Sequence, residues 1–181
     1  MKRIIAGCIT LALSGIALAE CNITSTTQNI DYGKRSAAMR QADRGKITQL
    51  TDRSATLILQ CDKTGRIRLQ IAPGNIVNGN FGFGTNGSMN LSVSNAFAGN
   101  DSLDLALVNN LGDSVSGVGT SSVLPSPGNW LVLMNHSQEA EIDSSKSVSM
   151  TLTISPSFKD EADITDMTDI AGNLNIQVEV L

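Results

Sequence analysis

The chain of 181 residues is poor in charge, in aromatic side chains and in histidine, and each shortage excludes a class of protein. Charged residues make up 17%, against roughly 25% in an average chain, and aromatic residues make up 3%. The formal net charge of −4 offers no basic surface for nucleic acid. The single histidine, His136, leaves no histidine-rich metal site and no identifiable partner for catalysis. Hydrophobic residues at 41% still suffice for a core, so we expect one β-rich secreted domain and no enzymatic activity.

The first nineteen residues have the three parts of a secretory signal peptide. A basic start, 1–3, precedes a mostly apolar, uncharged run, 4–17, and Ala17-Leu18-Ala19 is a small-x-small cleavage site. We expect cleavage before Glu20, so that 20–181 form one domain that does not span a membrane. Its 11 basic and 17 acidic residues leave a net charge of −6.

A lipoprotein is the alternative interpretation of the same end of the chain. Cys8 closes the motif Ile5-Ala6-Gly7-Cys8, but the apolar run before it is too short for a signal peptide. Cys21 follows Glu20, where lipidation needs a small residue. The sequence therefore favours a soluble exported chain.

Cleavage leaves two cysteines, Cys21 and Cys61, in the exported chain. An oxidising compartment favours a disulfide between them, and the alternative is a pair of free thiols. The sequence has no CxxC motif, so it gives no support to a redox or zinc site.

Apolar and polar residues alternate in six segments of the mature chain. Because successive side chains of a strand point to opposite faces, this period predicts half-buried antiparallel strands. The segments are 56–61, 66–71, 89–94, 103–107, 148–154 and 174–180.

Turn residues separate these strands, and no part of the mature chain has a sustained helical period. The segments 36–53 and 159–170 fit neither pattern. Many short strands with Gly, Pro and Asn turns predict an all-β, immunoglobulin-like β-sandwich.

Three motifs have a chemical and a structural interpretation. Residues 82–87 spell GxGxxG, but a strand follows in place of the helix that dinucleotide binding needs, so we expect a glycine-rich hairpin. The acidic run Asp160–Asp169 lacks the alternation of a calcium loop and is interpreted as a solvated loop. The basic stretch Lys34–Arg53 could bind a partner, but it is more typical of a solvated loop. We expect no metal and no cofactor.

Two large amphipathic aromatics, Tyr32 and Trp130, could stack on a sugar, but buried positions are the more usual role of such scarce side chains. The sequence gives less support to a catalytic site than to sugar binding. The serines lack a GxSxG motif, and nothing in the sequence marks a carboxylate pair.

Both ends of the mature chain resemble subunits of the chaperone–usher fimbrial pathway. The opening motifs are Cys21-Asn22-Ile23-Thr24 and Ile30-Asp31-Tyr32-Gly33, followed by a strand that ends in Cys61. The closing motif is Ile170-Ala171-Gly172-Asn173 before a terminal alternating strand. The middle of the chain is similar only in its strand pattern.

The resemblance implies an immunoglobulin-like sandwich of pilin type that lacks its last strand. A periplasmic chaperone, and later a neighbouring subunit delivered by the usher, then supplies that strand. By this resemblance Cys21 and Cys61 form the disulfide, and the chaperone pairs with the edge strand that carries Leu174, Ile176, Val178 and Val180. The protein would pass through the periplasm to the cell surface as a structural or adhesive subunit. A self-complete secreted module that binds carbohydrate or protein is the alternative.

Two departures from the fimbrial pattern affect the expected role. Val180 and Leu181 stand where such subunits commonly carry a tyrosine, and only Glu20 precedes Cys21, where a donor extension is expected. A subunit without a donor extension accepts a strand but passes none on. We therefore expect a tip or accessory position.

Overall fold

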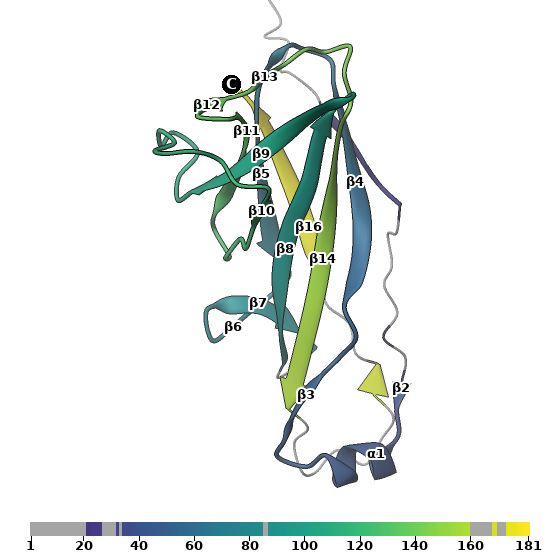
Figure 1. The fold of residues 1–181 in the computed structure, drawn as a ribbon. Helices are drawn as coiled ribbons and strands as arrows, with labels where there is room; N and C mark the ends of the chain where they lie inside the picture. Colours follow the sequence, from purple (N-terminus) through teal and green to yellow (C-terminus); the bar gives the residue numbers. More distant parts are fainter. Residues whose placement is uncertain (1–20, 27–31, 33, 85–86, 160–167, 170–172) are drawn as a thin grey trace, which may run out of the picture.

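The computed structural model describes residues 21–26, 32, 34–84, 87–159, 168–169 and 173–181. Within these ranges the chain forms one short helix and sixteen strands (Figure 1). The elements are β1 (Cys21–Ser25), β2 (Lys34–Arg35), α1 (Ala37–Ala42), β3 (Ile47–Gln49), β4 (Arg53–Cys61), β5 (Gly65–Pro73), β6 (Ile76–Val77), β7 (Asn80–Phe83), β8 (Gly87–Ala98), β9 (Asp101–Val108), β10 (Ser122–Val123), β11 (Trp130–Asn135), β12 (Gln138–Glu139), β13 (Glu141–Ile142), β14 (Val148–Lys159), β15 (Thr168–Asp169) and β16 (Leu174–Val180).

The first layer is the antiparallel sheet β1-β4-β14-β8. Leu59 of β4 pairs with Ile23 on one side and with Val148 on the other, so β1 and β14 lie on opposite edges of β4. The outward side chains of β14 are serines and threonines from Ser149 to Ser157 and then Lys159, while its inward side chains fill the core. This is the period-two pattern that the sequence predicts for 148–154.

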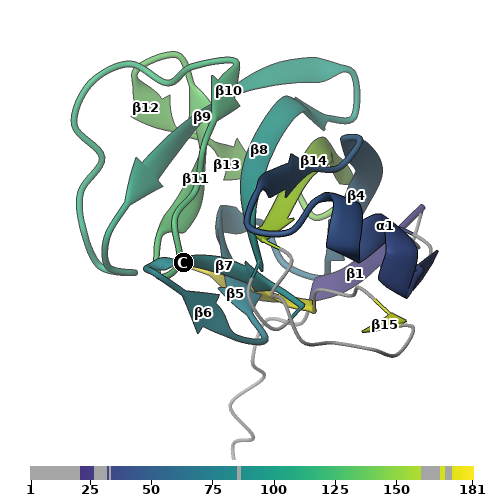
Figure 2. The ribbon, with the colours of Figure 1, turned by 90° about the horizontal axis from the view of Figure 1, so that it is seen from below.

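The same sheet curls into the second layer through the β8–β9 hairpin. Gly99 turns the chain with a φ of +61°, a conformation that glycine adopts without steric cost. From β9 the order continues through β11 to β5. Figure 2, a view from below, shows the curl. The inward faces of both layers share one buried core. The prediction of an all-β, sandwich-like fold is therefore confirmed.

The strands on either side of the GxGxxG segment pair with each other, as a hairpin requires, while its residues 85–86 lie outside the described ranges. β7 pairs with β8 through Phe83 and Gly87. A Cβ at Gly87 would lie 2.5 Å from the carbonyl oxygen of Phe83 and 2.6 Å from that of Ser157. Glycine is needed here because three backbones meet, which is a packing role.

β11 is a strand that the alternation pattern does not reveal, because both of its faces are buried. Leu131 and Leu133 point into the main core, while Trp130, Val132 and Met134 form a second apolar cluster outside the sheet. Residues of the loop after β9 cover this second cluster. The expectation of a buried Trp130 is confirmed.

The basic stretch contains a helix and strands, which corrects the expectation of a solvated loop, and it pairs with the acidic stretch. It contains α1 and β3, and β2 pairs with β15, which places Lys34 opposite Asp169 in the backbone ladder. The rest of the acidic run, at 160–167, and the expected signal peptide at 1–19 lie outside the described residues. None of the helices among the described residues has the length and hydrophobicity to cross a membrane.

Candidate functional site

The C-terminal strand β16 is the last strand on its side of the curled sheet. Leu69 of β5 pairs with Leu131 of β11 and also with Val178 of β16, so these two strands lie on opposite edges of β5. Among the described strands, β5 is the one with which β16 pairs. The other edge of β16 therefore has no partner among the described strands.

The pairing of β16 with β5 shows which backbone groups of β16 point toward that second edge. Leu181 donates its amide to the carbonyl of Arg66 at 2.9 Å and accepts the Arg66 amide at 3.1 Å. Antiparallel pairing alternates such bonded pairs with pairs whose amides and carbonyls point away. The residues whose N–H and C=O groups point away from β5 are Leu174, Ile176, Val178 and Val180.

The side chains of these four residues face the core without being fully buried by it. All four pack against the main core cluster and remain half-buried. On the adjacent β5, Ile67, Leu69 and Ile71 are 2%, 1% and 4% exposed. The difference follows from position, because β5 has a strand on each side, whereas β16 has a strand on one side in the part of the chain that the structure describes.

The strand β1 is the opposite end of the same sheet. Its pairing with β4 leaves its second edge open among the described strands, and Cys21 and Ile23 are half-buried against the same core. Among the described strands, β1 and β16 thus each have one unpaired edge, and we call their half-buried residues the open edge and define it by Cys21, Ile23, Leu174, Ile176, Val178 and Val180.

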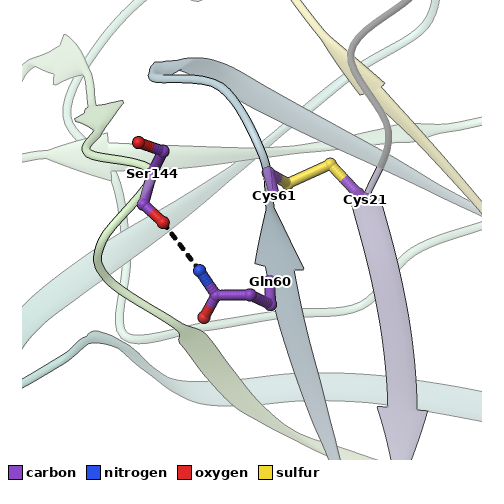
Figure 3. Close-up of a disulfide and its surroundings, with 4 residues drawn as sticks. All are labelled: Cys21, Gln60, Cys61 and Ser144. Atoms are coloured by element: carbon purple, nitrogen blue, oxygen red, sulfur yellow. Dashed lines mark hydrogen bonds between the residues drawn. A yellow bond between two sulfur atoms is a disulfide. The ribbon is translucent and has the colours of Figure 1, made fainter.

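A disulfide joins β1 to the body of the sandwich, as the sequence predicts. Cys21 and Cys61 are directly opposite in the ladder, with their Cα atoms 4.0 Å apart (Figure 3). Beside them Gln60 donates from Nε2 to the carbonyl of Ser144 at 2.7 Å. The bond fixes one border of the open edge.

Glycine at position 65 lets the C-terminal strand approach β5 closely. A Cβ there would lie 2.6 Å from Val180 Cγ1 and 3.0 Å from the carbonyl oxygen of Leu181. Any larger residue would displace the end of β16. The fold is therefore built to hold β16 in register against β5.

Arg68 departs from the alternation expected for β5, because it points out of the sandwich and is nevertheless 4% exposed. Its guanidinium donates from Nε to Glu139 Oε1 at 2.8 Å and from Nη2 to Oε2 at 2.9 Å. Its Nη1 donates to the carbonyls of Leu111 and Asp113. Through these hydrogen bonds Arg68 holds the loop after β9 against the second cluster.

The hydrogen bond from Arg68 holds the pKa of Glu139 below its ordinary value of 4.5, although burial opposes this shift. Because the folded pKa is lower than the unfolded one, the ion pair stabilises the fold above pH 4.5. This contribution is lost as the pH falls through the folded pKa.

Glu139→Gln is expected to lower the free energy of unfolding by about 3 kcal/mol near pH 7, since it leaves the buried Arg68 charge without its counterion. Urea titrations at several pH values measure the difference, which should shrink below pH 4.5. Asp101→Asn removes the exposed pair with Lys146, where the two side chains are 68% and 45% exposed, and should change little. Equal effects of the two variants would contradict the role given to Arg68.

A cavity of about 440 Å³ lies beside this fastened loop. Residues Leu105 to Val108 of β9 line one side of the cavity. Val115, Val118 and Thr120 of the loop and Val123 of β10 also line it. Val118 is 71% exposed at this site. Neither this cavity nor the Arg68–Glu139 pair is predictable from the sequence, because both depend on how the loop folds back.

His136, the one histidine, occupies an exposed turn with a φ of +58° and contacts Asn135 through Nδ1 at 2.9 Å. The described part of the chain brings together no group of three metal-ligating side chains.

Comparisons with known proteins reveal one clear relationship. The chain is 59% identical over 179 residues to the uncharacterized protein YhcE of Escherichia coli (strain K12), and the match covers 99% of each chain. No family model matches the chain, and no solved structure matches it. Since the identity extends along nearly the whole of both sequences, the chain belongs to the YhcE family.

Proposed function

We propose that this chain is a non-enzymatic subunit of fimbrial type that accepts a β-strand at its open edge. The strand comes first from a periplasmic chaperone and then, at the usher, from a neighbouring subunit. The subunit is exported by its signal peptide and reaches the cell surface as a structural or adhesive component. The observation that carries the proposal is the edge of β16, which has half-buried apolar side chains and, within the described ranges of the chain, no backbone partner.

Such an edge needs to be covered by another strand. An open strand beside apolar surface pairs with other chains and aggregates unless something covers it. An added strand would bond to the amides and carbonyls of Leu174, Ile176, Val178 and Val180. Its own apolar side chains would complete the burial of the same four residues. Strand addition supplies both kinds of interaction at once.

Two further features agree with this role. The Cys21–Cys61 disulfide suits an oxidising compartment such as the periplasm. With cleavage before Glu20, Cys21 is tied to β4 almost at once, and a donor strand of about ten residues has no place before it. We therefore propose a tip or accessory position.

The test is to express residues 20–181 in the periplasm with and without a periplasmic pilus chaperone from the same organism. The proposal predicts a stoichiometric complex with the chaperone and little soluble monomer without it. Equal yields of a monomer whose urea midpoint the chaperone does not change would contradict the proposal.

A self-complete secreted binding module is the second candidate, and the cavity beside the β9 loop favours it. The cavity combines the apolar Leu107, Val115 and Val123 with the polar Asn109 and Ser116. Binding pockets commonly have this mixture of apolar walls and a few polar groups. A stable lone monomer in the chaperone experiment would support this candidate.

A further inference from the structure

The sheet divides where β9 leaves β8. Ala96 of β8 pairs with Leu103, and further along β8 takes β10 as its neighbour, while β9 continues beside β11. Figure 1 shows β8 and β9 diverging from their shared hairpin. Beyond Leu103, the edge of β9 that faces away from β11 has one backbone partner among the described residues, which is the isolated bridge between Leu105 and Thr120.

The bridge shows which backbone groups point from that edge. Leu105 donates its amide to the carbonyl of Thr120 at 2.7 Å and accepts the Thr120 amide at 2.8 Å. Because the direction alternates along a strand, the N–H and C=O groups of Leu107 point from the same edge. The chain does not continue the bridge to Leu107, since it turns at Gly119, whose amide donates to the carbonyl of His136 at 3.0 Å. Among the described strands, none pairs with Leu107 on this side.

Leu107 lines the cavity of about 440 Å³ beside the loop after β9. Leu107 and Val123, which also lines it, are half-buried and pack against the main core. Val115, a third half-buried lining residue, packs against the second cluster on the other face of the sheet. The cavity therefore surrounds this edge of β9 and has apolar side chains on both of its faces.

A buried side chain holds one wall of the cavity. Arg68, which is 4% exposed, donates from Nη1 to the carbonyl of Asp113 at 2.9 Å, and Asp113 lines the cavity. Asp113 is the one charged residue among the described lining residues, and its carboxylate accepts the Asn110 amide at 2.9 Å. Because this charge is already engaged, the cavity favours an uncharged ligand.

We propose that the cavity binds a short, uncharged peptide segment of a partner protein, which adds to β9 in an extended conformation. One residue of the segment exchanges two main-chain hydrogen bonds with Leu107, as Thr120 does with Leu105. A peptide is the ligand class that brings a donor and an acceptor at the spacing of a bonded residue pair. The site is separate from the C-terminal strand, because β11 and β5 lie between β9 and β16. The inference therefore goes beyond the strand-accepting role and does not depend on it.

The register predicts which side chains the segment carries. Directly opposed residues of an antiparallel pair have their side chains on the same face. The residue opposite Leu107 therefore faces the core beside Val123 and is apolar. Its two neighbours face the loop, where Ser114 and Ser116 line the cavity, so hydroxyl side chains suit them.

The experiment uses the mature chain, 20–181, alone or in complex with its chaperone, and the tripeptide acetyl-Thr-Val-Thr-amide as the probe. NMR spectra of the ¹⁵N-labelled chain, titrated with the probe to about 10 mM, locate the binding site by residue. We expect the amide resonances of Leu107 and Val123 to shift.

Methylation of the probe separates the main-chain bonds from the apolar contact. N-methylation of the central valine removes the donor that faces Leu107 and should weaken binding roughly tenfold or more. N-methylation of the first threonine is the matched control, because that N–H points away from β9. The control probe should bind like the unmodified one.

A pair of variants tests the cavity from the side of the protein. Ser116 and Ser121 are both exposed, and of the two only Ser116 lines the cavity. Ser116→Phe adds a ring that leaves water by entering the cavity, so it should weaken binding roughly tenfold or more. Ser121→Phe should bind the probe as wild type does.

The outcomes distinguish this inference from the proposed function. Equal weakening by the two methylations, equal affinity of the two variants, or no binding at the highest probe concentration would each overturn the inference. Shifts confined to β16 would also overturn it, and they would support the strand-accepting function. The chaperone experiment that tests the proposed function does not involve the cavity, so either proposal can fail while the other holds.

Discussion

Val178→Asp is expected to remove the folded chain from the periplasm. Val178 faces the core from the middle of β16, opposite Leu69. A carboxylate there would lie against apolar side chains without a counterion, at a cost of about 2–3 kcal/mol for a half-buried site. It would also spoil the apolar surface that an added strand must cover. Immunoblots of periplasmic extracts, with and without chaperone, measure the loss.

The matched control is Gln177→Asp, one residue earlier on the same strand. Gln177 is on the exposed face, so the new charge stays in water and the chain should accumulate as wild type. Normal yield of Val178→Asp would show that the inward face of β16 is not needed for folding or for capture. Equal loss of both variants would indicate a general effect of added charge.

Removing the disulfide is expected to cost about 4 kcal/mol of unfolding free energy, because it closes a loop of 40 residues. That is a large part of the roughly 5–15 kcal/mol that stabilises an ordinary domain. The double variant Cys21→Ala, Cys61→Ala removes the bond without leaving a free thiol. Urea unfolding of the purified chain measures the change.

Reduced wild-type protein is the control for the side chains themselves, because it loses the bond and keeps both sulfur atoms. It should unfold at a urea concentration close to that of the double variant. Alkylation of both thiols in the native, unreduced protein, read by mass spectrometry, would contradict the disulfide itself. A double variant as stable as wild type would contradict the stabilising role.

The sequence predicts strands well wherever one face of the sheet meets water. Met89, Leu91 and Val93 are buried on β8, and Leu57 and Leu59 are buried on β4, as their alternation indicates. The period of two is a local property, so one sequence suffices to detect it. The all-β sandwich follows from several such segments separated by turns.

Elements with two buried faces could not be found in this way. β11 reads as a continuous apolar run because the loop after β9 covers its outer face. The same loop buries Arg68, which looks like a solvent-facing residue in the sequence. Both errors have one cause, since a pattern within a strand carries no information about a distant loop that packs on it.

For the same reason, one part of the candidate site could be predicted from the sequence and another part could not. The alternation in 174–180 predicts which side chains of β16 face the core. These side chains are only half-buried because no second described strand lies beside β16, and this is a property of the sheet order. The burial of the Tyr32 hydroxyl, which has no hydrogen-bond partner among the described residues, is likewise a property of the fold.

Amide hydrogen exchange resolved by residue tests the open edge most directly. In the free chain, the amides of Leu174, Ile176, Val178 and Val180 should exchange fast, while those of Gln177 and Glu179, bonded to β5, should be protected. Addition of a chaperone or a strand peptide should protect the first set and leave the second unchanged. Protection of both sets in the free chain, or no new protection in the complex, would contradict the account of β16 as a strand acceptor.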